Sequence, residues 1–135
     1  FYNDSVKCHT TETEFDVSSL KELPKVGVAY FTIDADPEIL DYYKESGVQG
    51  IVIAGAGSGC YSEQWNNKID ELAETGIPVV RCSRIGSGVI TQDDYFIGNI
   101  ARGNDLAPQK AATLLRLILT VTNDIEQVQN MFDKY

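Results

Sequence analysis

The chain has 135 residues, of which 43% are hydrophobic and 23% are charged, and its formal net charge is −9. This length suits one compact domain with a buried core. The negative charge repels nucleic acid and anionic membranes at long range, so we expect neither as a partner. No apolar run in the sequence approaches the roughly 20 residues that cross a bilayer. The longest apolar-rich stretch, residues 111–121, is interrupted by polar side chains.

The first residues are polar and irregular. The chain starts at Phe1, without an initiator Met and without the basic and apolar segments of a signal peptide, so we expect a fragment or a processed product. Residues 1–20 are predicted to be a linker or arm that leads into a domain at residues 21–135. Three apolar side chains near its end are expected to hold the arm to the domain: Phe15, Val17 and Leu20.

Strand and helix patterns then alternate. Residues 26–31 form a short apolar run that predicts a buried strand. Asp36 and Pro37 suit the cap and first position of a helix, and Gly47 ends it.

The second strand is predicted at residues 50–54, whose uniformly apolar side chains are typical of a parallel strand covered on both faces. Ser62 is expected to cap the next helix and Gly76 to end it. The apolar residues of that helix recur at helical spacing: Trp65, Ile69, Leu72 and Ala73.

The third strand is predicted at residues 77–82, followed by a loop at 86–94 and a short fourth strand at 95–101. Residues 108–122 form a strongly amphipathic pattern that predicts a long helix. Asp124 is expected to cap a last helix. The residues of that helix predicted to be buried are Ile125, Val128, Met131 and Phe132.

This alternation predicts an α/β fold: a small, Rossmann-like three-layer α/β/α sandwich with a parallel sheet of about four strands. Function in such sheets gathers at the carboxyl ends of the strands. Here those ends carry residues 55–60, residues 81–85 and the loop near Asp93.

The sharpest local motif is the turn that contains Gly55, Gly57 and Gly59. A dinucleotide site would require G-x-G-x-x-G and an acidic residue at the end of the next strand. The third glycine comes one position early, and the next strand ends in Arg81-Cys82-Ser83-Arg84, so we reject a nicotinamide or flavin site. Two readings stay open: a tight turn required by packing, or contact between backbone and ligand.

Two charged pairs lie near the predicted strand ends. Arg81 and Arg84 could hold a carboxylate ligand, but with 20 acidic residues in the chain we favour a surface or interface salt bridge. Asp93 and Asp94 could bind a cation or an amino group, but we favour simple solvation.

The three cysteines, Cys8, Cys60 and Cys82, match no zinc-binding spacing, and His9 is the only histidine. We expect three buried or half-buried thiols, and no metal site. No hydroxyl or thiol lies in a recognisable nucleophile motif, so the reacting groups of an enzyme would lie on another segment.

Several segments, in order along the chain, resemble the C-terminal domain of bacterial-type (type II) L-asparaginases. Their collinearity is more specific than any one motif. The segments are 9–17 with 23–26 (linker and first strand), 50–59 (second strand and glycine turn), 78–84 (third strand), 106–115 (start of the long helix) and 124–135 (closing helix, ending in Tyr).

The resemblance implies an enzyme that hydrolyses L-asparagine, and often L-glutamine, to the acid and ammonia without a cofactor. Its catalytic threonines would lie in an N-terminal domain that precedes this chain, so the chain alone is expected to be inactive. The resemblance also implies a homotetramer built as two intimate dimers, in which the C-terminal domain completes the neighbouring subunit's active site. It suggests a periplasmic or secreted location.

Within this resemblance, Cys60 takes the place of an Asn or Ser that reaches the neighbour's substrate, and Ser58 is expected beside it. A family Glu in the following loop falls on Tyr95 by ungapped counting, and the loop at 86–95 is shorter, so Asp94 is the candidate carboxylate. A thiol is a weaker hydrogen-bonding group than an amide or hydroxyl, so we expect an altered substrate preference. Two other functions stay open: a stand-alone ligand-binding or interaction domain derived from this family, and part of a related amidase or amidotransferase subunit.

Overall fold

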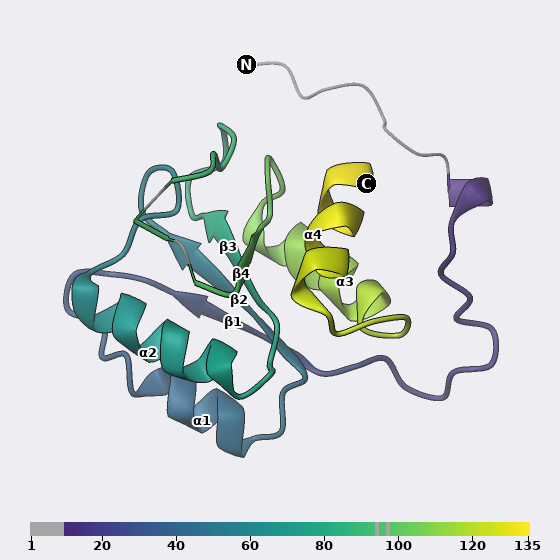
Figure 1. Cartoon of the computed structure of the whole chain (residues 1–135), viewed down its shortest axis with the longest axis horizontal. Helices are drawn as coiled ribbons and strands as arrows, with labels where there is room; N and C mark the ends of the chain where they lie inside the picture. The colour runs from purple at the N-terminus through teal and green to yellow at the C-terminus, as the bar shows by residue number, and fades with distance from the viewer. Residues whose placement is uncertain (1–9, 94, 97) are drawn as a thin grey trace.

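A computed structural model describes residues 10–93, 95–96 and 98–135. Its centre is a four-stranded parallel sheet, with the strands in the order β1-β2-β3-β4 (Figure 1). The parallel sheet predicted from the strand–helix alternation is therefore confirmed. The strands are β1 (Val26–Tyr30), β2 (Gly50–Gly55), β3 (Val79–Ser83) and β4 (Ile100–Arg102).

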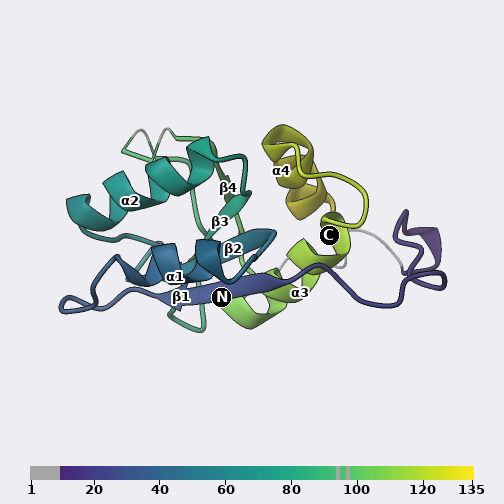
Figure 2. The same cartoon turned by 90° about the horizontal axis from the view of Figure 1, so that it is seen from below.

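Two helix layers enclose this sheet (Figures 1 and 2). The crossover helices α1 (Ile39–Glu45) and α2 (Glu63–Glu74) cover one face, because both crossovers advance in the same direction with the same hand. The chain leaves β4 into α3 (Pro108–Ile118) and α4 (Ile125–Lys134), which cover the opposite face. The three-layer α/β/α sandwich is thus as expected. A short 3₁₀ turn, η1 (Thr10–Glu12), precedes the sheet.

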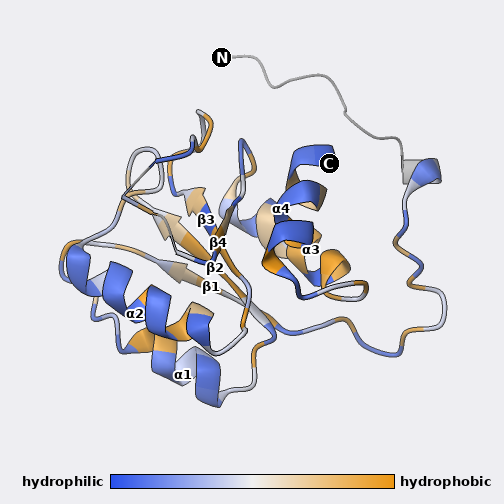
Figure 3. Cartoon of the chain, in the orientation of Figure 1, coloured by the Kyte–Doolittle hydropathy of each residue, from blue (hydrophilic) through white to orange (hydrophobic). Residues whose placement is uncertain are grey.

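The core lies on both sides of β2, every residue of which is buried. Ile51 and Ile53 pack toward α1 and α2, whereas Val52 packs toward α3 and α4. Successive side chains of a strand point to opposite faces, so a strand between two helix layers has to be apolar at every position. Figure 3 shows the same arrangement, with apolar residues along the strands and hydrophilic residues on the outer sides of the helices.

The predicted helix boundaries hold where a local side-chain or backbone signal fixes them. The Ser62 hydroxyl accepts a hydrogen bond from the Trp65 backbone N–H, and the Asp124 carboxylate accepts one from Gln127. The glycines that follow α1 and α2 adopt left-handed conformations, with φ of 72° at Gly47 and 83° at Gly76.

Several predicted boundaries were wrong, including the start of the third strand, which is Val79 rather than residue 77. α1 begins at Ile39, because residues 36–38 form a tighter turn in which the Leu40 N–H bonds to the Pro37 carbonyl. β4 begins at Ile100 rather than residue 95. α3 ends at Ile118, just before residues 120–122, which are all β-branched and therefore poor helix formers.

The described part of the arm contacts the C-terminal end of the chain through Glu14 and Phe15. The rings of Phe15 and Tyr135 lie 5.1 Å apart, and Phe15 packs against the core cluster on the α3 and α4 face. Val17 and Leu20 remain 46% and 41% exposed, so the expectation that they also hold the arm was wrong. Lys134 forms an ion pair with Glu14 at 2.8 Å, and the Tyr135 hydroxyl bonds to the same carboxylate.

The free edge of the sheet at β4 is closed by one amide side chain. Gln129 of α4 accepts a hydrogen bond from the Arg102 N–H at 2.7 Å and donates one to the Arg102 carbonyl at 3.4 Å. An unpaired strand edge is a template for pairing with another chain. The amide of Gln129 substitutes for a neighbouring strand at this position.

We predict that Gln129→Ala lowers the free energy of unfolding by about 2 kcal/mol, because the half-buried Arg102 N–H loses its partner. Gln127→Ala is the matched control, since that side chain is exposed on the same helix. Urea unfolding of both variants measures the difference. Equal stability of the two variants would show that the edge does not depend on this amide.

A second prediction concerns pH. Hydrogen bonds from Lys134 and Tyr135 lower the pKa of the Glu14 carboxyl from 4.5 to about 2. A lowered pKa stabilises the folded contact above pH 4.5, and that stabilisation is lost as the pH falls toward 2. We expect the protection of the residue 13–16 amides, which is the intrinsic exchange rate at each pH divided by the observed rate, to fall across this interval in the wild type, whereas Glu14→Gln lacks this protection at every pH. A wild-type profile that does not change between these pH values would contradict this role of Glu14.

Candidate active-site edge

The carboxyl ends of the strands bring three connecting segments to one edge of the sheet. Residues 56–60 follow β2, residues 84 and 85 follow β3, and Phe31 follows β1. The segments are joined to one another by hydrogen bonds: the Phe31 N–H donates to the Ala54 carbonyl, and the Arg84 N–H donates to the Gly55 carbonyl at 2.8 Å. This is the edge at which sequence analysis placed the candidate site.

The glycine turn after β2 folds back on itself. Ala56 and Cys60 form an antiparallel bridge, with the Ala56 N–H donating to the Cys60 carbonyl at 2.7 Å. Gly57 and Gly59 have φ of 53° and 87°, which side chains rarely adopt. A Cβ on Gly55 would overlap the backbone carbonyl of Gly59. Each glycine therefore has a structural cause, which supports the packing interpretation of the motif.

The polar side chains of this turn face solvent. Ser58 and Cys60 are both exposed, and the Ser58 Oγ and Cys60 Sγ atoms lie 3.7 Å apart. The expectation of a buried or half-buried thiol was wrong for Cys60 and right for Cys82, whose pKa is raised to about 12 by burial. Asp94, Cys8 and His9 lie outside the described residues.

β3 fixes the turn from one side. The Ser83 hydroxyl donates a short hydrogen bond to the Gly57 carbonyl and accepts one from the Ile85 N–H at 3.0 Å. The side chain of Ser83 is buried in the sheet edge. One hydroxyl thus fixes both the position of the turn and the path of the chain that leaves β3.

The side chain of Arg81 in β3 binds the glycine turn through a backbone carbonyl. Its side chain is only 2% exposed, and its guanidinium donates to the Ser58 carbonyl at 3.0 Å and to the Thr91 carbonyl at 2.8 Å. The guanidinium carbon lies 4.1 Å from the centre of the Phe96 ring. Burial lowers the pKa of Arg81 by removing water from the charged form.

The surface salt bridge that we favoured for the two arginines does not form within the described residues, whereas a carboxylate ligand and an interface salt bridge stay predictions. Among residues 10–93, 95–96 and 98–135, no acidic side chain forms an ion pair with Arg81 or Arg84. The exposed Arg84 donates to the Phe31 carbonyl at 2.7 Å. Sequence reasoning missed this role because both arginines satisfy backbone carbonyls of distant segments. The exposed Asp93 bonds within its own loop, where its carboxylate accepts a hydrogen bond from the Tyr95 N–H at 2.9 Å.

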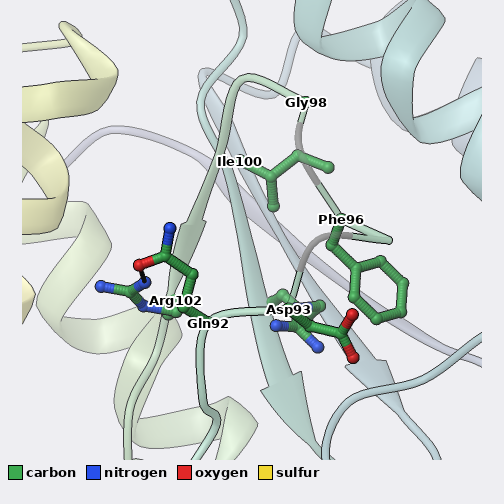
Figure 4. A pocket seen from close by; sticks show the side chains of 7 residues that line it. Gln92, Asp93, Phe96, Gly98, Ile100 and Arg102 are labelled. Carbon is green, nitrogen blue, oxygen red and sulfur yellow. Dashed lines mark hydrogen bonds between the residues drawn. The ribbon is translucent and has the colours of Figure 1, made fainter.

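A pocket of about 250 Å³ adjoins Arg81 on the side of β4. Gln92 and Arg102 lie together on one side, joined by a hydrogen bond of 3.3 Å, and Asp93 and Phe96 lie on the other side (Figure 4). The remaining lining residues are Gly98 and Ile100. The pocket is mainly polar, so it suits a polar group better than an apolar one.

Within the part of the chain that the structure describes, no three His, Cys, Asp or Glu residues are grouped closely enough to hold a metal ion. No helix in the same residues is both long and apolar enough to cross a membrane.

The parallel sheet, with an exposed glycine turn at its carboxyl edge, is typical of α/β domains, in which ligands bind outside the carboxyl ends of the strands. The profile of the Glutaminase/Asparaginase C-terminal domain family matches residues 25–132. The chain therefore belongs to the glutaminase/asparaginase C-terminal domain family.

Comparison with individual proteins supports this family assignment. The chain is 43% identical over 131 residues to L-asparaginase 2 of Escherichia coli, covering 94% of this chain and 37% of that protein. It is 39% identical over 136 residues to L-asparaginase 2 of Bacillus subtilis, covering 100% of this chain and 36% of that protein. A crystal structure of a probable cytoplasmic L-asparaginase from Campylobacter jejuni superposes with a TM-score of 0.89 at 37% identity, over 100% of this chain and 45% of that one.

The chain thus spans less than half the length of these relatives. Related proteins differ in the compartment and activity that their names state. One, from Haemophilus influenzae, is a probable periplasmic L-asparaginase, and one, from Acinetobacter glutaminasificans, is a glutaminase-asparaginase.

We predict that Gly55→Ala destabilises the chain by roughly 3 kcal/mol, because its Cβ forces the turn away from β2. Gly57→Ala is the matched control: a Cβ there meets nothing within 4 Å, so only the left-handed conformation costs ~1–2 kcal/mol. Thermal or urea unfolding compares the two. If Gly55→Ala is no more damaging than Gly57→Ala, the close approach does not determine the turn.

Proposed function

We propose that this chain is the C-terminal domain of an L-asparaginase, which hydrolyses L-asparagine, and also L-glutamine, to the corresponding acid and ammonia. The observation that carries the proposal is the family match over residues 25–132, together with the exposed Ser58 and Cys60 at the carboxyl edge of the sheet. We place the domain at residues 21–135, preceded by an arm at residues 1–20. The described part of the arm holds one short 3₁₀ turn, and Val17 and Leu20 are exposed, which supports this division.

Ser58, Cys60 and Asp94 would contact the substrate in the active site of a neighbouring subunit. The exposure of Ser58 and Cys60 supports this role for the glycine turn. Asp94 is proposed from the family resemblance alone. The arrangement requires a homo-oligomer, proposed as a tetramer made of two dimers, and an N-terminal domain that carries the threonine nucleophile.

In the reaction, a threonine hydroxyl attacks the side-chain amide carbon and ammonia leaves, which forms an ester that water then hydrolyses. Backbone donors stabilise the negative charge on the amide oxygen as the tetrahedral intermediate forms. The residues of this chain would bind and orient the amino-acid end of the substrate, away from the bond that breaks. Their contribution is therefore to substrate affinity and selectivity.

We propose a periplasmic or secreted location for the full-length protein, supported by the related periplasmic enzyme of Haemophilus influenzae. The related enzyme of Campylobacter jejuni is named as cytoplasmic, so both compartments occur among the relatives. Cell fractionation with an antibody against this domain distinguishes the two.

We predict that the 135-residue chain hydrolyses neither amide, whereas the full-length protein releases ammonia from L-asparagine. A coupled ammonia assay on both proteins measures this. Turnover by the chain alone would refute the division of labour between the domains. A folded full-length protein without amidase activity would favour the stand-alone binding domain.

Replacing Cys60 tests its contact with the substrate. In the full-length protein, we expect Cys60→Asn to raise kcat/KM for asparagine about fivefold and to shift the asparagine-to-glutamine ratio, because an amide adds one hydrogen bond of ~1 kcal/mol. Cys82→Ala is the control, since that thiol is buried in the sheet and its loss should leave the ratio unchanged. An unchanged ratio in Cys60→Asn would remove this residue from the site.

A further inference from the structure

We infer that Arg81 is a positioning residue that sets the distance between the two loops proposed to reach the substrate. The inference rests on the proposed function, because it assigns Arg81 to the same site. One loop is the glycine turn with Ser58 and Cys60, and the other is the loop after β3, which the structure describes at residues 91–93 and 95–96.

The geometry is a bridge made by one side chain. Arg81 Nη1 donates to the Ser58 carbonyl, which lies 23 residues earlier in the chain, and Nη2 donates to the Thr91 carbonyl, 10 residues later. A guanidinium is planar, so its two donors hold a fixed separation and direction. The two carbonyls, and hence the two loops, are held at a distance that this plane determines.

The bridge is rigid because Arg81 has little room to move. Its side chain is 2% exposed, the Phe96 ring covers the guanidinium, and a Cβ on Gly59 would lie 3.1 Å from Arg81 Cγ. Hydrogen bonds from a charged donor strengthen where water is excluded. Phe96 itself belongs to the second loop, so that loop contacts Arg81 through a ring as well as a carbonyl.

Lysine cannot reproduce this bridge. Its ammonium is a single point charge on a flexible stem, without two donors at a fixed separation. Arg81→Lys keeps the positive charge and most of the volume, so it changes the bridge more than the packing. The domain provides a matched control in Arg84, whose side chain also donates to a backbone carbonyl, that of Phe31, and within the described residues forms no bridge between the two loops; its backbone bond to Gly55 is kept in Arg84→Lys.

The kinetic test uses the full-length oligomer. We expect Arg81→Lys to raise KM for asparagine at least about tenfold while kcat changes less than about threefold, because the displaced loops lose contacts to bound substrate. Arg84→Lys should leave both constants unchanged. A purely structural role would reduce the amount of folded enzyme, which lowers apparent kcat and leaves KM unchanged. An unchanged KM in folded Arg81→Lys would overturn the inference.

Hydrogen exchange on the same proteins separates this inference from the proposed function. The Gly59 and Cys60 amides, which donate to the Ala56 carbonyl, should exchange at least about tenfold faster in Arg81→Lys and at the wild-type rate in Arg84→Lys. Wild-type protein that hydrolyses neither amide would refute the proposed function and leave this measurement valid. Equal exchange rates in Arg81→Lys and wild type would show that Arg81 does not hold the turn.

Discussion

The parallel pairing of β2 on both of its edges is the constraint on which the rest of the structure depends. All six residues of β2 are buried, and its neighbours β1 and β3 both run in its direction. Three strands therefore end at the same edge of the sheet, and each must turn there to reach a helix or loop.

Turns at such an edge expose carbonyls that have no partner in the sheet, and a buried unpaired carbonyl costs ~1–3 kcal/mol. Here β3 and the residue that follows it supply the partners. Arg81, Ser83 and Arg84 donate to carbonyls of the glycine turn or of the end of β1. The glycines permit the shape of the turn, and these donors select one position for it. The result is a fixed platform from which Ser58 and Cys60 project into solvent.

The sequence predicted features that depend on neighbouring residues. The uniformly apolar β2, the caps Ser62 and Asp124, and the glycines after α1 and α2 are all readable within a few positions. The role of Arg81 could not be predicted from the sequence. Its hydrogen-bond partners lie 23 and 10 residues away and are backbone atoms, which have no sequence signature. The strand ends and the family resemblance predicted where the candidate site lies, whereas the hydrogen bonds that support it depend on how distant segments meet in the folded chain.

The account makes the carboxyl edge part of an active site completed by a second polypeptide segment. The most direct measurement is a crystal structure of the full-length oligomer with bound L-aspartate, the product. The account predicts that the turn at residues 55–60 lines the ligand across a subunit interface, with Ser58 Oγ or Cys60 Sγ within about 4 Å of a polar ligand atom. A turn that packs away from the ligand, with no atom of residues 55–60 facing the cleft, would contradict it.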